Sequence, residues 1–181
     1  MRGDNRAFGE RSVADEDAVP CVRVTDLFPD LWAESTQGSV ELHDWAQGSY
    51  SIFFTHPSSY SPTAEVELVD LARHKDDFDA LGCKVMGMSQ SDPLTERMWI
   101  QELSEKHGLA IPFPIISDED GRIAAICGLR EQNEALDRPV AKTFILGPDL
   151  RIRAVQEYIH PVPRSAAELL RIVGLLKSAR I

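Results

Sequence analysis

A short segment combines residue types that could do chemistry with a helix start that would support them. Residues 55–67 read THPSSYSPTAEVE, with an imidazole, several hydroxyls and two carboxylates. Ser61 suits the N-cap of a helix and Pro62 suits its first position. Backbone N–H groups and the positive end of the helix dipole would favour an anionic or nucleophilic group in the first turn. That turn instead carries Ala64, which is unreactive.

The side chains around Ala64 allow both a chemical and a structural interpretation. His56 could act as a general base, although a histidine at a strand end is more often hydrogen-bonded scaffolding. The Ser61 hydroxyl could contact a substrate or only cap the helix. Lys142 could bind an anion or form a Schiff base, or it could face solvent. Pro57 and Tyr60 complete the set and could simply shape the turn.

The elements that must position these residues are predicted from apolar periodicity. Short apolar runs predict strands at 49–55, 83–89 and 113–117, and a hairpin over 142–158. Helical spacing predicts helices from Ser61 to about residue 80, from Asp92 to Gly108, before Gly128, and from a Ser165/Glu168 capping box onward. This order predicts an α/β fold with a central mixed sheet flanked by helices, and a thioredoxin-like fold is the leading candidate.

Length and composition favour one globular domain. The chain has 181 residues, 43% of them hydrophobic, and a formal net charge of -10. Residues 1–20 lack apolar periodicity and are expected to form a flexible N-terminal arm before a compact domain over 21–181. Scattered basic residues argue against nucleic acid or a membrane as a partner. No apolar run approaches the roughly 20 residues of a membrane-spanning helix, and the N-terminus lacks the apolar centre of a signal peptide, so a cytoplasmic location is expected.

The cysteines and histidines suggest no cofactor. Cys21, Cys83 and Cys127 form no close pair and have no metal-like spacing, so neither a disulfide framework nor a zinc site is expected. The five histidines are not grouped with carboxylates in a metal-binding pattern. We therefore expect neither a metal nor another cofactor.

The segment FFTHPSSYSPTAEVE resembles the active-site segment of peroxiredoxins. In that family the pattern is Pro, three residues, Thr, two residues and then the peroxidatic Cys, and Pro57, Ser61 and Ala64 fall on those three positions. Further similarity covers 35–45, 82–92, 112–124 and 143–153. The chain most resembles one-Cys peroxiredoxins of the alkyl hydroperoxide reductase and thiol-specific antioxidant group, without the longer C-terminal arm of that subgroup.

The resemblance implies a thioredoxin-like fold, a homodimer and thiol-dependent peroxidase chemistry. In the family, the helix start and an Arg stabilise the thiolate that attacks peroxide. Here Ala64 replaces the nucleophile, and Ala141 aligns with the Arg. His56, Glu67 and Arg164 match positions that surround the family's pocket or orient its Arg.

Two interpretations of Ala64 remain open. The protein can be a natural relative without Cys-based peroxidase activity, whose pocket is vestigial, binds a small-molecule ligand or substrate, or serves non-redox chemistry. Alternatively, it is a thiol-dependent peroxidase in which Cys was changed to Ala at position 64. The simultaneous absence of the thiol and of Arg at position 141 favours the natural relative. The remaining cysteines are expected to be buried or distant, so we do not expect one of them to take over the reaction.

Overall fold

The computed structural model describes residues 22–56, 58–129, 141–158 and 162–180. The elements in chain order are β1 Trp32–Ser35, β2 Gly38–Glu41, α1 Leu42–Ala46, β3 Tyr50–Thr55, α2 Pro62–Arg73, α3 Lys75–Ala80, β4 Cys83–Ser89, α4 Pro93–His107, β5 Ile115–Ser117, α5 Arg122–Ile126, β6 Lys142–Leu146, β7 Ile152–Glu157 and α6 Ala166–Ala179. The expected arm over 1–20 lies outside the described residues, so the division into an arm and a 21–181 domain stays a prediction. In the described ranges, no helix has the length and apolar character needed to cross a bilayer.

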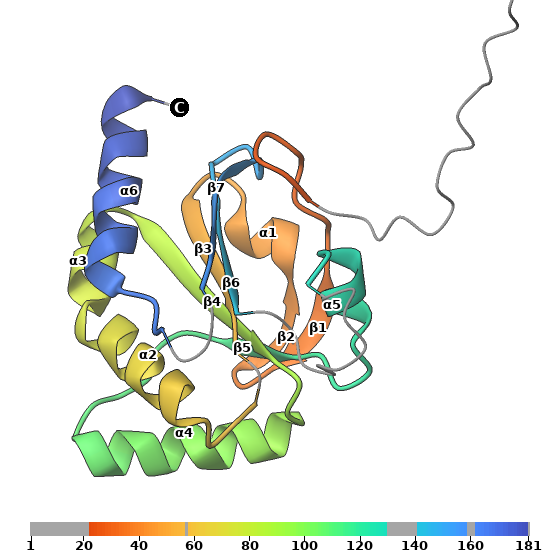
Figure 1. The fold of residues 1–181 in the computed structure, drawn as a ribbon, viewed down its shortest axis with the longest axis vertical. Coiled ribbons are helices and arrows are strands. Elements are labelled where there is room, and N and C mark those ends of the chain that lie inside the picture. The colour runs from red at the N-terminus through yellow and green to blue at the C-terminus, as the bar shows by residue number, and fades with distance from the viewer. Residues whose placement is uncertain (1–21, 57, 130–140, 159–161, 181) are drawn as a thin grey trace, which may run out of the picture.

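A seven-stranded mixed sheet forms the centre of the molecule, as predicted (Figure 1). Its strand order is β2-β1-β5-β4-β3-β6-β7. β4 pairs in parallel with both β3 and β5, whereas β6 is antiparallel to both β3 and β7. β3 therefore lies between its parallel partner β4 and its antiparallel partner β6.

Helices cover both faces of the sheet because the strand residues are apolar on both sides. Phe54 and Ile145 pack with α2, α3, α4 and α6 in one core cluster. Phe53 and Phe144 pack with α1 and α5 in a second cluster on the other face. Successive strand residues thus face opposite layers, which decides the side on which each candidate side chain lies.

The predicted helix from Ser61 to about residue 80 is two helices in the structure. α2 ends at Arg73, and His74 has φ −98° and ψ 14°, outside the helical range. The His74 N–H is shared between the carbonyls of Asp70 and Leu71, and α3 restarts at Lys75. The helical pattern continues across the break, so periodicity did not reveal it.

The predicted Ser165/Glu168 capping box is not formed. Ser165 is the N-cap of α6 but makes no side-chain cap hydrogen bond. The Ala166 N–H donates instead to Asp70 Oδ2 at 2.8 Å, while Glu168 pairs with Arg171. A carboxylate from α2 therefore caps α6, which ties the helix that carries Ala64 to the C-terminal helix.

Candidate functional site

The chain leaves the carboxyl end of β3 and enters α2 through a tight turn. Ser61 is the N-cap of α2, as predicted, and its Oγ accepts from the Ala64 N–H at a long 3.5 Å. Tyr60 has φ 61°, in the left-handed region that bulky residues rarely adopt. Pro57 lies outside the described residues, so its expected role in shaping the turn stays a prediction.

Ala64 is part of the hydrophobic core in this structure. Its side chain is 1% exposed and belongs to the cluster that contains Leu68 of α2, Phe54 of β3 and Ile145 of β6. A methyl group in this cluster contributes packing, and it can neither ionise nor attack a substrate.

Glu67 of α2 and Arg164 form a buried ion pair. Arg164 Nε lies 3.1 Å from Glu67 Oε2, and the Arg164 backbone N–H donates to Glu67 Oε1 at 2.8 Å. The two terminal guanidinium nitrogens donate to Thr143 Oγ1 at 3.1 Å and to the Thr55 carbonyl. The guanidinium also lies 4.7 Å from the centre of the Phe54 ring. These contacts join α2, β3, β6 and the segment before α6.

The charge of Arg164 is already balanced within the protein. Burial lowers the pKa of Arg164 from its ordinary value, and the charge of Glu67 and its hydrogen bonding oppose that effect. All three guanidinium nitrogens contact protein groups. Arg164 therefore acts as a structural tie, and it does not offer a free cation to an incoming anion.

Lys142 lies on the opposite face of the sheet from Ala64. Its Nζ donates to the Gly128 carbonyl at 3.3 Å and forms an ion pair with Glu157. Its neighbour Thr143 faces the α2 layer, where it contacts Arg164. Alternation along β6 therefore places Lys142 away from the other candidate residues. Ala141 is half-buried and directly precedes β6, and extending the alternation by one residue predicts that its side chain lies on the α2 side.

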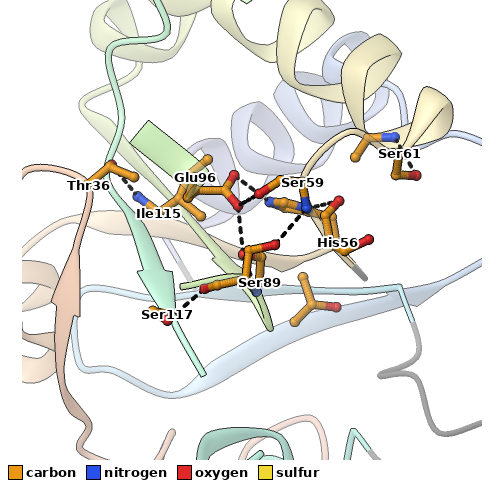
Figure 2. A network of polar contacts seen from close by, with 12 residues as sticks. Thr36, His56, Ser59, Ser61, Ser89, Glu96, Ile115 and Ser117 are labelled. Atoms are coloured by element: carbon orange, nitrogen blue, oxygen red, sulfur yellow. Dashed lines mark hydrogen bonds and ion pairs between the residues drawn. The ribbon is translucent and has the colours of Figure 1, made fainter. Parts of the chain in front are cut away.

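His56 takes part in a buried network at the carboxyl ends of β3, β4 and β5 (Figure 2). Its Nε2 lies 3.3 Å from Oε1 of Glu96 on α4, and neither atom has a hydrogen-bond partner among the described residues. Glu96 Oε2 accepts from Ser59 Oγ at 2.6 Å and from Ser89 Oγ at 2.8 Å. His56 and Glu96 are each 1% exposed. The second interpretation of His56, as hydrogen-bonded scaffolding, fits this position.

The sequence prediction missed Glu96, Ser59 and Ser89 as members of this network. Glu96 lies in the first turn of α4, where the helix dipole favours an acidic residue, so its presence there did not indicate a further role. Its burial follows from the packing of α4 against the sheet, which a single sequence does not reveal. A carboxylate one helical turn before the apolar Trp99 was the available signal.

Tyr60 is the exposed member of the predicted set. Its side chain is about half exposed, and its ring centre lies 5.9 Å from that of Trp99. The hydroxyl donates to Glu102 at 3.0 Å, and this hydrogen bond is the main reason that the pKa of Tyr60 is raised. The neutral Tyr60 hydroxyl thus connects the turn before α2 to Glu102 of α4.

A separate groove of about 380 Å³ lies on the outer side of α2. It is lined by residues of α2, the end of α4 and the segment before α6, namely Glu65, Val66, Val69, Asp70, Arg73, His107, Pro163, Arg164 and Ser165. Ala64 and Ser61 do not line it. Two of its acidic groups are paired, Glu65 with Lys106 and His107, and Asp70 with His74.

The two described cysteines are poor candidates for a substitute nucleophile. Burial raises the pKa of the Cys83 thiol to about 12, and burial and the charge of Asp118 raise that of Cys127 to about 12. Cys21 lies outside the described residues. Across the described part of the chain, no group of three or more His, Cys, Asp and Glu side chains could hold a metal ion.

We expect Cys83 and Cys127 to react very slowly with a thiol reagent in the folded protein. At about pH 8 the thiolate fraction of each is on the order of a thousandfold below that of a free thiol with pKa about 8.5. A Cys21→Ser variant isolates the two, and mass spectrometry after brief alkylation, with and without urea, measures them. Rapid modification of either cysteine without urea would contradict this expectation.

Comparison with known proteins identifies relatives across most of the chain. The model of the AhpC/TSA family matches residues 24–155. A peroxiredoxin of Nanoarchaeum equitans is 32% identical over 152 residues, which cover 84% of this chain and 68% of that protein. A 1-Cys peroxiredoxin of Medicago truncatula is 31% identical over 166 residues, which cover 89% of this chain and 76% of the relative.

Solved structures share the fold. The crystal structure of a Cys-to-Ser mutant of peroxiredoxin 6 of Arenicola marina matches with a TM-score of 0.80 and 26% identity, over 88% of this chain and 75% of that one. A yeast mitochondrial 1-Cys peroxiredoxin matches with a TM-score of 0.81 and 26% identity, over 88% of this chain and 78% of that one. The predicted thioredoxin-like fold is confirmed.

Proposed function

Because the chain belongs to the AhpC/TSA family of peroxiredoxins, we propose that it is a member without cysteine-based peroxidase activity. In this proposal, the former peroxide pocket at the start of α2 binds a small molecule. The observation that carries the proposal is the buried methyl group of Ala64 in the first turn of α2, where the family resemblance places the nucleophile. No chemical property of alanine replaces a thiolate.

The surroundings of Ala64 support the same conclusion. The resemblance aligns Ala141, which carries no charge, with the Arg that stabilises the thiolate in the family. The described Arg164 is already paired with Glu67. Lys142 contacts Gly128 and Glu157 on the other face of the sheet. A peroxide or thiolate at the first turn of α2 would therefore lack the guanidinium that normally stabilises its charge.

Binding is better supported than a new non-redox reaction at this site. The start of α2 offers backbone N–H groups and the Ser61 hydroxyl, which favour a small anionic or oxyanionic ligand. His56, the natural general base of the set, is 1% exposed and held between Glu96 and the turn. A buried imidazole in that position is not available to a substrate proton.

We expect the native chain to reduce hydrogen peroxide no faster than a protein-free control that contains the same thiol donor. The reason is that no described group can form a reactive thiolate at neutral pH. Consumption of the donor followed by absorbance measures the rate. Saturable turnover abolished by Cys21→Ser would show that a thiol outside the described residues takes over, and it would contradict the proposal.

The binding half of the proposal is tested separately by thermal shift. Small carboxylates and inorganic phosphate are expected to raise the melting temperature of the native chain, and Ser61→Ala is expected to reduce that rise. Arg73→Gln, in the separate groove, is the matched control and should leave the rise unchanged. Equal melting of the native chain with and without every anion would indicate a vestigial pocket.

The alternative is a thiol-dependent peroxidase in which Cys was changed to Ala at position 64. The cysteine variants in the Discussion distinguish this alternative from the proposal.

A homodimer and a cytoplasmic location also belong to the proposal. Closed two-fold assemblies are the commonest form of soluble oligomers, and β7 is an edge strand of the sheet, whose start at Ile152 is hydrogen-bonded to Thr25 and Asp26. Light scattering coupled to size-exclusion chromatography tests the dimer.

A further inference from the structure

The turn that leads into α2 is attached to α4 through one carboxylate oxygen. Glu96 Oε2 accepts from Ser59 Oγ at 2.6 Å and from Ser89 Oγ at 2.8 Å. Figure 2 shows Ser59 reaching Glu96 from the side of the turn, with Ser89 reaching it from the end of β4. This oxygen therefore joins three segments that lie far apart in the sequence, namely the turn, β4 and α4.

Ser91 completes a closed ring of hydrogen bonds with this carboxylate. The Ser59 N–H donates to Ser91 Oγ at 2.8 Å, and the Ser91 N–H donates to Ser89 Oγ at 3.2 Å. Ser117 Oγ at the end of β5 donates to the Ser91 carbonyl at 2.7 Å, so the ring is also fixed to the sheet. Ser59 is thus held through both its backbone and its side chain.

Glu96 enters the ring as a charged acceptor. Burial would raise the pKa of Glu96, but the nearby His56 and the hydroxyls of Ser59 and Ser89 oppose this effect and lower the pKa below its ordinary value. Hydrogen bonds to an ionised carboxylate are shorter and stronger than those between neutral groups, and the bond from Ser59 has such a length. It is therefore a strong connection between the turn and α4.

The residue that follows Ser59 depends on such a connection. Tyr60 has φ 61°, and a bulky residue keeps this conformation only where the surrounding structure holds it. The bond from Tyr60 to Glu102 is exposed, so water competes for the same groups. Ser61, next along the chain, caps α2. The position of this cap therefore depends more on the part-buried bond of Ser59 than on the exposed bond of Tyr60.

We propose that Glu96 is a positioning residue for the start of α2. It holds Ser59, and through the turn it fixes the Ser61 cap and the N–H groups of the first helical turn. The proposal deepens the proposed function and rests on it only for the ligand, because the ring of hydrogen bonds belongs to the chain with or without an occupant of the pocket.

Amide hydrogen exchange, measured by NMR on the full chain, tests this role. Ser59→Ala is expected to speed exchange of the Ala64 and Glu65 N–H groups about fivefold or more, as loss of one hydrogen bond would. These groups donate to the side chain and the carbonyl of Ser61. Exchange at Leu71, in the middle of α2, should stay as in the native chain. Unchanged exchange at all these positions, or equal acceleration at Leu71, overturns the proposal, because the effect would then be absent or global.

Variants of Glu96 and a matched control identify the group responsible. Glu96→Leu removes the acceptor and should speed exchange at the helix start at least as much as Ser59→Ala does. Glu96→Gln keeps an oxygen without the charge and should lie between Glu96→Leu and the native chain. Ser104→Ala is the control, because Ser104 on α4 donates to the Ile100 carbonyl at 2.8 Å and takes no part in the ring. Native exchange in Glu96→Leu, or fast exchange in Ser104→Ala, overturns the assignment to Glu96.

Titration calorimetry with inorganic phosphate tests whether this positioning serves the site. If the native chain binds phosphate, Ser59→Ala is expected to raise the Kd about threefold or more, because a less ordered helix start offers its donors in the binding geometry less often. An equal Kd together with faster exchange overturns the positioning role. A native chain that does not bind phosphate contradicts only the binding half of the proposed function, and the exchange result then decides the role of Glu96.

Discussion

The double variant Ala64→Cys/Ala141→Arg is expected to reduce hydrogen peroxide about 100-fold faster than Ala64→Cys alone. The first change supplies a thiol in the first turn of α2, where unpaired N–H groups favour the thiolate. A thiol that is as buried as Ala64 is also held back by desolvation, so the helix start alone is a weak activator. Arg at position 141, which alternation along β6 predicts to lie on the α2 side of the sheet, adds the positive charge. Single-turnover peroxide reduction, followed by intrinsic fluorescence, measures both rates.

Lys142 provides a matched control one residue away. The variant Ala64→Cys/Lys142→Arg carries the same added groups, but its guanidinium starts from the face that contacts Gly128 and Glu157. It should react no faster than Ala64→Cys. If both double variants are equally fast, the assignment of opposite faces to residues 141 and 142 is wrong.

The single variant separates the two interpretations of Ala64. If the chain is a peroxidase in which Cys was changed to Ala, Ala64→Cys alone restores fast peroxide reduction without any change at position 141. If the chain is a natural member without this chemistry, the single variant stays slow and gains its rate only with the added Arg. A slow rate in every variant would indicate that more of the pocket has changed than these two positions.

Replacing Arg164 with Met is expected to lower the free energy of unfolding by about 3–5 kcal/mol. Both members of the ion pair are almost completely buried, at 2% and 4% side-chain exposure. Removing the guanidinium leaves the Glu67 carboxylate without its counter-charge and takes the donors away from Thr143 and Thr55. Urea unfolding followed by circular dichroism measures the change.

Neutralising Glu67 as well tests whether its unpaired charge causes the loss of stability in Arg164→Met. Glu67→Gln/Arg164→Met removes both charges, and the amide oxygen of Gln can still accept from the backbone N–H of residue 164. This double variant should therefore be more stable than Arg164→Met, although it carries one more substitution. A double variant that is less stable than the single one would show that lost packing, and not an unpaired charge, dominates.

The sequence was most informative where one side chain or one local pattern decides the structure. Continuous apolar runs predicted β3 and β4 within a residue, and the hairpin predicted over 142–158 is formed by β6 and β7. The short elements β1, β2 and α1 were not predicted as such, because each is only four or five residues long, too short to show a clear apolar period.

The site shows the same division between local and distant causes. Ser61 was predicted as a helix cap from its neighbours alone, and the structure agrees. Adjacent residues of a strand point to opposite faces of the sheet. The nearness of Lys142 to Ala141 in the sequence therefore wrongly suggested that Lys142 belongs to the site around Ala64. The contact between His56 and Glu96 joins the residue after β3 to α4, and only the packing of that helix on the sheet brings them together.

The position of β3 between β4 and β6 has a consequence for synthesis of the chain. All six residues of β3 are buried, and its parallel partner β4 follows soon after it along the chain. Its antiparallel partner β6 begins only at Lys142, so the opposite edge of this fully buried strand has nothing to pair with until β6 has been synthesised. Nascent chains that stop before β6 should therefore depend on chaperones and aggregate readily.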